Sequence, residues 1–365
     1  MAEWSRRSLA DVVELRRGFD LPTRMRKPGP YPVLSAGSVA GSHVEGPVRG
    51  PGMVVGRATN LGEPTWCATD FWPLNTTLYV ADFKDNVPRW VFHLFESIDL
   101  KGYDSGSVQP MLNRNYIAGV EVLVPPLAEQ RAIAEVLGAL DDKIAANTRL
   151  ATTADALAIA LASTAPASVP LASLAEHARR SVAPESTGAT LVDHYSLPAF
   201  DAAQGPERVD PSTIKSNKFL VSTPAVLVSK LNPRFPRVWE VPQIGELPVL
   251  ASTEFVVLEP KEITTAVLWA LVAQPAFSAT LAGMVAGTSG SHQRVRPAEM
   301  LMTLVGDPTE LAAEVQSGVT AAVRRAGAAR AENIQLAATR DALLPALMSG
   351  RMRVRDAEAV VADAT

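Results

Sequence analysis

The chain has 365 residues, of which 47% are hydrophobic and 20% are charged. At roughly one domain per 150 residues, this length allows two or three domains, each able to bury its own core. The composition excludes a largely disordered protein, because disordered chains combine low hydrophobicity with high charge. The net charge of -4 argues against a nucleic-acid partner, but residues 1–60 carry nine Arg or Lys against five Asp or Glu. Local basic loops can bind phosphate even when acidic helices elsewhere cancel the total.

The first elements in chain order are short β-rich runs separated by Gly, Pro, Asn and Asp turns. Strands are expected at 53–57, 76–81 and 120–125, with a helix at 88–97. The single cysteine, Cys67, cannot form an intramolecular disulfide, and the charged N-terminus does not resemble a signal peptide. A cytoplasmic location is therefore expected.

A long helix is expected next, from Leu127 to about Ser163. This stretch has no proline, and apolar or small residues recur at a spacing of three and four. Prolines flank it on both sides, which favours helix boundaries there.

The second half of the chain begins with more β-rich runs, expected as strands at 225–230 and 254–260, and a helix is expected at 264–274. Residues 265–287 are an uncharged stretch of 23 residues, long enough to span a membrane. Because the stretch contains Gln274 and Pro275 and lacks flanking basic anchors, a buried helical hairpin and no membrane contact are expected. A second long helix is expected from about Pro308 to Leu347, with Pro345 kinking its last turn.

The main observation is an internal repeat. Residues 147–163 align without gaps to residues 333–349, and ten of these seventeen positions are identical. SGSVQ (105–109) matches SGSHQ (289–293), PGMVVGR (51–57) resembles PAVLVSK (224–230), and LADVVELRR (9–17) resembles LASLAEHARR (171–180). The matches keep their order while the offset drifts, as expected for two copies of one module with different loop lengths.

The repeat predicts a duplicated α/β (α+β) architecture. The expected segments are a first domain at 1–125, a first long helix at 126–165, a second domain at 166–306, a second long helix at 307–350 and a C-terminal tail at 351–365. Each long helix needs a partner of similar length for its apolar stripe, and the other copy is the obvious candidate. The alternative is that each helix packs only on its own domain.

The sequence VPPLAEQRAIAEVLGALDDKI, residues 124–144, closely resembles the start of the first conserved helix of type I restriction-modification specificity subunits. The ending LLPALMSGRMRV, residues 343–354, is similar to the end of that family's second helix. One departure is that the start of the second helix, DPTELAAEV at 307–315, lacks the double proline and the Glu-Gln pair.

The resemblance implies two target-recognition domains and two long antiparallel helices forming a coiled coil. It further implies a non-catalytic subunit that binds double-stranded DNA, two adenine-N6 methyltransferase subunits and two restriction subunits. S-adenosylmethionine, ATP and Mg²⁺ are then expected on the partner subunits, and no cofactor on this chain. The helix residues expected to form the coiled coil or dock partners are Glu129, Gln130, Ile133, Leu137, Leu140, Ile144, Leu336, Leu343 and Leu347.

Two similar but non-identical readers on a rigid spacer are expected to recognise an asymmetric bipartite site. Arg, Lys, Asn and Gln are the residue types that best read base edges, and basic or hydroxyl side chains bind phosphates. The candidates in the first domain are Arg49, Arg57, Asn60, Gln109, Asn113 and Arg114. Those in the second domain are Lys230, Asn232, Arg234, Arg237, Gln293, Arg294 and Arg296.

Other chemistry has little support in the sequence. The five histidines and one cysteine show no metal-ligand spacing, and no Walker A loop is present. Asn232-Pro233-Arg234-Phe235 resembles the adenine-positioning motif of amino-methyltransferases but lacks its second proline. Two alternatives stay open at this point, a divergent DNA methyltransferase and a coiled-coil assembly scaffold.

Overall fold

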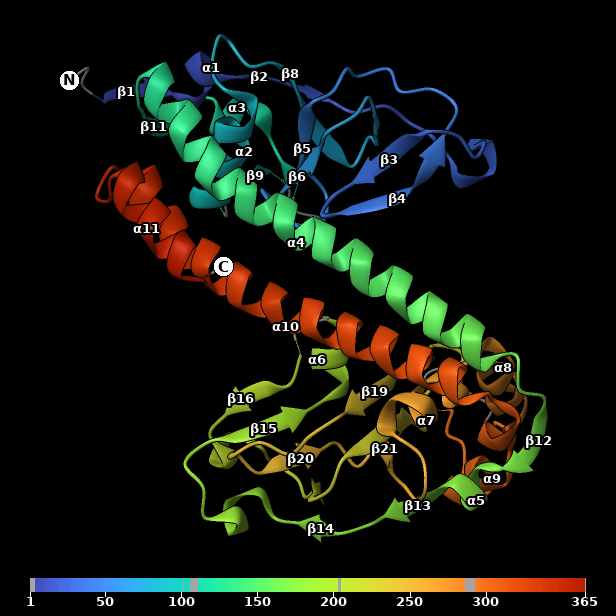
Figure 1. Cartoon of the computed structure of the whole chain (residues 1–365). Coiled ribbons are helices and arrows are strands. Elements are labelled where there is room, and N and C mark those ends of the chain that lie inside the picture. The colour runs from blue at the N-terminus through green and yellow to red at the C-terminus, as the bar shows by residue number, and fades with distance from the viewer. Residues whose placement is uncertain (1–3, 101, 106–110, 203–204, 286–292, 365) are drawn as a thin grey trace. The chain divides into compact units, whose positions relative to one another are not determined.

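The computed structural model describes residues 4–100, 102–105, 111–202, 205–285 and 293–364 (Figure 1). The chain divides into two compact units. Unit 1 comprises residues 1–144 and 335–365, and unit 2 comprises residues 145–334. Each of the two long helices, α4 (Leu127–Ala162) and α10 (Ala313–Met348), therefore contributes one part to each unit.

Unit 1 is built around an antiparallel sheet with strand order β2-β8-β5-β6, beside a smaller sheet β4-β3-β7 and the pairs β1-β11 and β9-β10. The strands are β1 (Ser5–Ser8), β2 (Glu14–Arg17), β3 (Tyr31–Ser35), β4 (Ser38–His43), β5 (Gly52–Gly56), β6 (Pro64–Cys67), β7 (Trp72–Pro73), β8 (Thr77–Asp82), β9 (Asp104–Ser105), β10 (Met111–Leu112) and β11 (Glu121–Val124). The helices are α1 (Leu9–Val12), η1 (Thr23–Met25), α2 (Pro88–Ser97), α3 (Arg114–Ile117) and α11 (Val354–Ala364). The apolar core joins Trp90 and Phe95 of α2 to Met53 of β5 and to Leu137 of α4.

Unit 2 repeats this plan with an antiparallel sheet β13-β21-β18-β19, a larger sheet β14-β17-β20-β15-β16 and the pair β12-β22. The strands are β12 (Ala167–Pro170), β13 (Ala175–Ala178), β14 (Ser181–Val182), β15 (Val192–Tyr195), β16 (Glu207–Val209), β17 (Lys218–Val221), β18 (Ala225–Ser229), β19 (Val238–Val241), β20 (Val249–Ala251), β21 (Phe255–Pro260) and β22 (Leu304–Gly306). The helices are α5 (Leu171–Leu174), η2 (Pro184–Thr187), α6 (Leu197–Asp201), η3 (Pro211–Thr213), α7 (Thr265–Val272), α8 (Pro275–Gly283), α9 (Pro297–Met302) and η4 (Pro308–Glu310).

The two units share one topology. The sheets β2-β8-β5-β6 and β13-β21-β18-β19 have their strands in the same spatial order and the same order along the chain. In both, the first strand follows a four-residue helix, the last sequential strand precedes a helix (α2 or α7), and a two-stranded pair leads into a long helix. The internal duplication predicted from the repeat is therefore present in the fold.

The two long helices pack antiparallel, and Figure 1 shows them running alongside each other. In unit 2, Asn147 donates to Glu332 at 2.8 Å and Asp155 pairs with Arg330, so rising numbers in α4 meet falling numbers in α10. In unit 1 the same order holds, because Arg340 donates to Asp141 at 3.0 Å.

The apolar contacts of the two helices differ between the units. In unit 1 they are large side chains that include all the predicted aliphatic positions: Ile133, Leu137, Leu140, Leu336, Leu343 and Leu347 are buried, and Ile144 packs against them. In unit 2 they are mostly small, with buried Ala151, Ala154, Ala158 and Ala162 of α4 and Ala322, Ala326 and Ala329 of α10. Both stripes recur at three and four residues, as a helix pair requires.

Most predicted elements are present with small boundary shifts. The expected strands correspond to β5, β8, β11, β18 and β21, and the expected helices to α2 and α7. The uncharged stretch 265–287 begins with the helix pair α7 and α8, bent by 58°, and every residue from Ala266 to Val272 is buried. Among the described residues no single helix is long and apolar enough to cross a membrane; α7 and α8 reach that threshold only when taken together. The predicted tail instead forms α11, whose Ala357 is buried in the core of unit 1.

Candidate nucleic-acid interface

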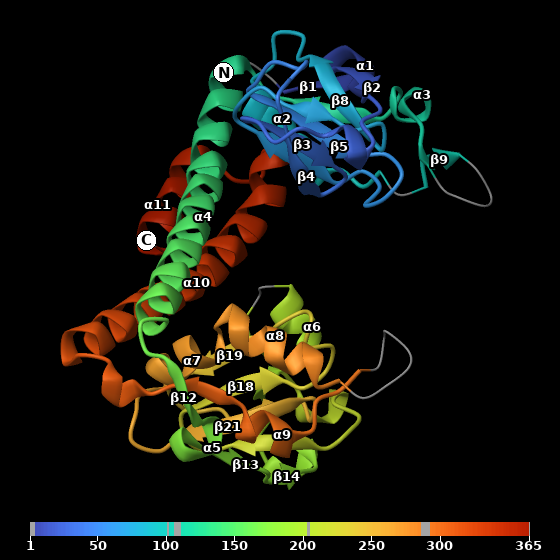
Figure 2. The same cartoon turned by 90° about the vertical axis from the view of Figure 1, so that its right-hand side faces the viewer.

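In unit 1, two arginines meet at one end of the sheet. Arg17 is the last residue of β2, Arg57 directly follows β5, and the start of β8 lies between them (Figure 2). The Arg17 side chain donates to the Asn75 carbonyl at 3.4 Å, and the backbone of Arg57 donates to the Thr76 carbonyl at 3.0 Å. Burial and the neighbouring charge of Arg17 lower the pKa of Arg57. We call these residues the Arg17–Arg57 pair.

A third cation is attached to the same end of the sheet. The backbone N–H of Leu112, in β10, donates to the Arg57 carbonyl at 2.8 Å. Arg114, two residues later, donates to the Leu15 carbonyl of β2 at 3.3 Å and is otherwise exposed. Three positive side chains therefore surround the ends of β2, β8 and β5.

Unit 2 builds the same arrangement from different residues. Arg179 directly follows β13, Lys230 directly follows β18, and the start of β21 lies between them (Figure 2). The backbone of Lys230 donates to the Glu254 carbonyl at 2.9 Å, and the backbone of Val295 donates to the Lys230 carbonyl at 3.0 Å. We call these residues the Arg179–Lys230 pair.

The charges of this pair also affect the pKa of His177. Burial, followed by the charges of Arg179 and Lys230, lowers the pKa of His177 to about 4, so its ring is neutral at pH 7. The neutral ring can accept a hydrogen bond, and His177 Nδ1 lies 3.1 Å from the donating Arg179 Nε.

The register shows that the two pairs are equivalent. Gly56 of β5 faces Thr77 of β8, and Ser229 of β18 faces Phe255 of β21. Residues 57 and 230 therefore occupy one position in the two copies. The repeat of residues 9–17 at 171–179 likewise superposes Arg17 on Arg179. Sequence reasoning selected Arg57 and Lys230 but missed Arg17 and Arg179, although the repeat already contained that signal.

Several predicted DNA-contacting arginines are held by carboxylates within unit 2. Arg237 donates twice to Asp201, at 2.6 and 2.8 Å. Arg294 donates twice to Glu254, at 3.0 and 2.9 Å, and this bonding lowers the pKa of Glu254. Both guanidinium groups would have to release a carboxylate before they could read a base.

The predicted asparagines occupy turns and a helix start. Asn60 has a positive φ of 46° and donates to the Ala36 carbonyl at 3.2 Å. Asn113 caps α3 by accepting from the Asn115 backbone at 3.0 Å. Asn232 also has a positive φ, 49°, and its backbone donates to the Gln293 carbonyl at 2.8 Å. Asn tolerates left-handed backbone better than most residues, which explains Asn60 and Asn232, while Asn113 is explained by its helix cap.

The remaining predicted arginines are exposed. Arg49 and Arg234 are exposed, and neither forms an ion pair with a described residue. Arg296 is exposed at the start of α9 and lies 3.8 Å from Glu299. Gln109 falls outside the described residues, as does most of the SGSxQ match.

At the start of α4, Gln130 is a buried structural residue and not an exposed docking group. It is 2% exposed, accepts from the Val87 backbone at 3.0 Å, and donates to Asn86 and to the Pro125 carbonyl, each at 3.0 Å. The neighbouring Glu129 accepts from the Trp4 indole at 3.0 Å. These bonds attach the first turn of α4 to unit 1.

The second long helix has its own counterpart of Gln130. The offset of 186 residues that aligns the helix repeats places Gln316 at this position. Gln316 donates to the carbonyls of Pro308 at 2.9 Å and Leu311 at 3.1 Å, and Leu311 is the equivalent of Pro125. The second copy thus keeps the glutamine, which sequence reasoning missed because the neighbouring Glu and the prolines differ.

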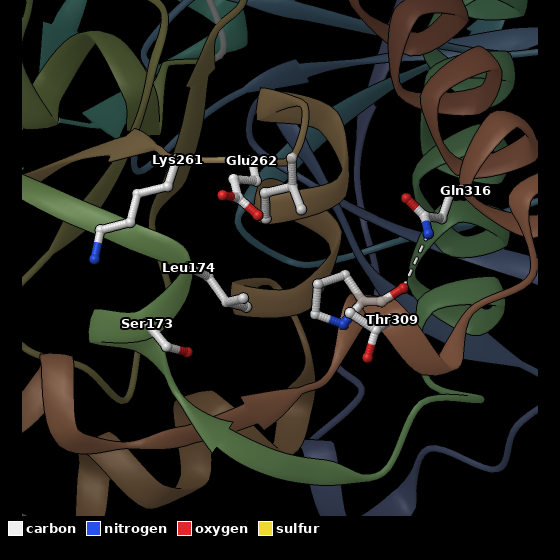
Figure 3. A pocket seen from close by; sticks show the side chains of 8 residues that line it. Ser173, Leu174, Lys261, Glu262, Thr309 and Gln316 are labelled. Carbon is white, nitrogen blue, oxygen red and sulfur yellow. Dashed lines mark hydrogen bonds between the residues drawn. The ribbon is translucent and has the colours of Figure 1, made fainter.

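A pocket of about 330 Å³ adjoins Gln316 in unit 2 (Figure 3). Its lining includes Lys261 and Glu262 beyond the end of β21 and Thr309 in the turn before α10. In unit 1, Asn86 and Gln130 bond to each other at the corresponding helix start. In the lining of this pocket, the Ser173 hydroxyl donates to the Pro170 carbonyl at 2.7 Å and the Lys261 ammonium donates to the Ala172 carbonyl at 2.7 Å. In the described part of the chain, no group of His, Cys, Asp or Glu is arranged to hold a metal ion.

Comparison with protein families identifies the first copy. Residues 1–153 match the type I restriction modification DNA specificity domain. Residues 1–153 are therefore similar to a domain of type I restriction-modification specificity subunits, the family that residues 124–144 resemble. The matched domain is one of DNA specificity, as the sequence resemblance implied, and not a methyltransferase domain.

One solved structure shares the fold of this chain, and two others match it over most of its length. The S subunit of a type I restriction-modification system from M. genitalium has a TM-score of 0.61 at 14% identity, covering 95% of this chain and 96% of that chain. The HsdS subunit from Thermoanaerobacter tengcongensis covers 96% of this chain and 97% of its own at 14% identity, with a TM-score of 0.34. A chain from a structural study of type I complex assembly covers 94% of this chain and 97% of its own at 15% identity, also with a TM-score of 0.34. No curated protein sequence matches the chain.

Proposed function

We propose that the chain reads an asymmetric, bipartite site on double-stranded DNA, with one half-site bound by each α/β domain. The observation that carries this proposal is the duplicated cationic end of the sheet, formed by the Arg17–Arg57 pair in unit 1 and the Arg179–Lys230 pair in unit 2. Two cations at equivalent positions of two related domains suit a polyanion that is bound twice.

The two half-sites differ in sequence because the surroundings of the two pairs differ. Thr76 in unit 1 corresponds to Glu254 in unit 2, and Met111 corresponds to Arg294. Glu254 and Arg294 bond to each other, so unit 2 presents an ion pair where unit 1 presents the hydroxyl of Thr76 and the thioether of Met111. Readers that differ in this way select different bases.

The long helices serve as the spacer between the readers. Each helix has 36 residues, or a length of about 54 Å at a rise of about 1.5 Å per residue. On this proposal, the rod fixes the number of unread base pairs between the half-sites, roughly one to one and a half turns of duplex.

As a member of a type I complex, the chain would dock two methyltransferase subunits and two restriction subunits in the cytoplasm. S-adenosylmethionine, ATP and Mg²⁺ would be bound by those partners and not by this chain. Since Gln130 and Glu129 bond internally, docking at the start of α4 would rest on exposed neighbours such as Leu127, which is 42% exposed.

The test is to co-purify the chain with its cognate methyltransferase subunit and map the methylated adenines on genomic DNA. A bipartite asymmetric motif, bound specifically by the complex in fluorescence anisotropy, is the expected result. Adenine methylation by the chain alone, or a complex without a sequence motif, would refute the proposal. The scaffold alternative is tested by Arg57→Ala combined with Lys230→Ala, which abolishes DNA binding but not complex assembly if the domains are DNA readers.

A further inference from the structure

Comparing the two copies distinguishes two kinds of DNA contact, those with bases and those with phosphates. If the copies read different half-sites, equal charges at equivalent positions cannot by themselves supply the discrimination. Contacts that hold the duplex without reading it can be the same in both copies, because phosphates are alike at every base pair.

We propose that Arg17 with Arg57, and Arg179 with Lys230, are sequence-independent phosphate anchors, one pair in each recognition domain. They set the register of the duplex on each domain, while positions whose charge differs between the copies, such as Thr76 and Glu254, lie among the residues that read the bases. This inference rests on the proposed function, since it assigns roles within the same DNA-binding sites.

The backbone holds each pair in place. Arg57 and Lys230 donate their backbone N–H groups to residues just before β8 and β21, and each accepts from the strand or loop that follows (Leu112 or Val295). The Cα positions are therefore fixed by hydrogen bonds on both sides, while the cationic ends remain adjustable. A backbone fixed in this way suits a contact that sets register.

The charges of the pairs are not neutralised within their units. Among the described residues, none of the four cations forms an ion pair with a carboxylate, in contrast to Arg237 and Arg294. Burial, followed by repulsion from Arg17, lowers the pKa of Arg57. An anion between the two cations removes this repulsion and adds charge-assisted hydrogen bonds.

The Arg-to-Lys difference identifies the phosphate as the ligand. Arg and Lys can both donate to guanine, but Lys is a flexible point charge without the planar fork of Arg, so a guanine contact would have a different geometry in the two copies. A phosphate contact needs only the positive charge, which Arg57 and Lys230 share. If Arg57 alone read a base, the presence of a cation at the equivalent position, Lys230, would not be explained.

The experiment uses the complex of the chain with its methyltransferase subunit and four variants, Arg17→Gln, Arg57→Gln, Arg179→Gln and Lys230→Gln. For each variant, the expected slope of log K against log salt concentration is shallower by about 0.9, the value for one phosphate contact. Affinity falls by a similar factor for the cognate duplex and for an unrelated duplex, and the methylated motif is unchanged. A relaxed base preference at one half-site, or an unchanged salt slope, would overturn the inference.

Exchanges that keep the positive charge distinguish the effect of losing the charge from the effect of disturbing the fold. Arg57→Lys and Lys230→Arg place in each copy the residue used by the other, so affinity, salt slope and motif are expected to stay at the wild-type values. If Arg57 reads guanine, Arg57→Lys instead relaxes the motif at that half-site.

Matched surface controls complete the design. Arg16 neighbours Arg17 on β2, is directed to the opposite face by strand alternation, and pairs with Glu14 at 2.8 Å. Arg208 in unit 2 pairs with Asp193 at 3.2 Å. Arg16→Gln and Arg208→Gln are expected to leave the salt slope unchanged, and a loss equal to that of the anchor variants would contradict the assignment. A wild-type complex that binds no specific duplex refutes the proposed function itself, whereas specific wild-type binding with unaffected anchor variants refutes only this inference.

Discussion

Replacement of Gln130 by alanine should destabilise unit 1 by about 3 kcal/mol. The substitution removes a buried side chain that accepts from the Val87 backbone and donates to Asn86 and Pro125, all at 3.0 Å. Each buried polar group left without a partner costs about 1–3 kcal/mol, and water entering the vacated space recovers part of this. For a unit of this size, about 3 kcal/mol corresponds to a fall in Tm of about 6–12 °C.

The structure supplies a matched comparison in Gln316→Ala. Gln316 also donates two hydrogen bonds, but the carbonyls of Pro308 and Leu311 lie beside a pocket of about 330 Å³. Water can replace the lost donor there, so the expected cost is about 1 kcal/mol. Urea denaturation followed by tryptophan fluorescence measures both variants, and hydrogen exchange at the Val87 amide reports the local effect. Equal costs for the two substitutions, or a larger cost for Gln316→Ala, would refute the reasoning.

Three further predictions concern the packing and charge of the units. Asp141→Ala leaves Arg89 and Arg340 without their shared carboxylate, which is 13% exposed, and should cost about 3 kcal/mol in urea denaturation; Asp142→Ala, at an 81% exposed side chain, should cost almost nothing. The low pKa of His177, about 4 against 6.5, means that the unfolded chain binds the proton first, so stability is lost as the pH falls from 6.5 towards 4. His177→Leu, the residue found at the equivalent position 15, should make the Tm less dependent on pH over that range. Ala158→Leu overfills the fully buried contact between α4 and α10 in unit 2, and thermal unfolding should show a loss of about 1–3 kcal/mol.

The sequence predicted the fold well wherever a periodic pattern was strong. β5 and β18 are runs of buried valine and other apolar residues flanked by turn residues, and both appear within one residue of their expected bounds. The long helices were predictable because their apolar stripes continue over many turns and prolines mark their boundaries. The tail was not recognised as a helix, because α11 is short and depends on burying Ala357 against unit 1.

The candidate site was predicted less well, because one residue type serves several purposes. Arg and Asn were chosen for their ability to read bases, but the same side chains form ion pairs and cap turns. Arg237 is separated by 36 residues from Asp201, and Arg294 by 40 from Glu254, so no local pattern reveals that they are neutralised. The Arg17–Arg57 pair is equally non-local, since it forms only when β8 inserts between β2 and β5.

Comparing the two copies shows which structural features constrain the sequence and which do not. The four-residue helices α1 and α5 each leave a carbonyl that a lysine satisfies, Lys84 for Ala10 and Lys261 for Ala172. By the strand register, the position equivalent to Lys84 in the second copy is residue 262. The lysine that donates to the helix carbonyl is Lys261, so it lies one position earlier in the second copy. A carbonyl at such a helix end must find a donor, and any residue that reaches it is acceptable. Loops that supply no hydrogen bond of this kind can change length and residue type at little cost in stability. The surfaces around the two cation pairs are therefore free to diverge, so that one fold presents two different surfaces in a single chain.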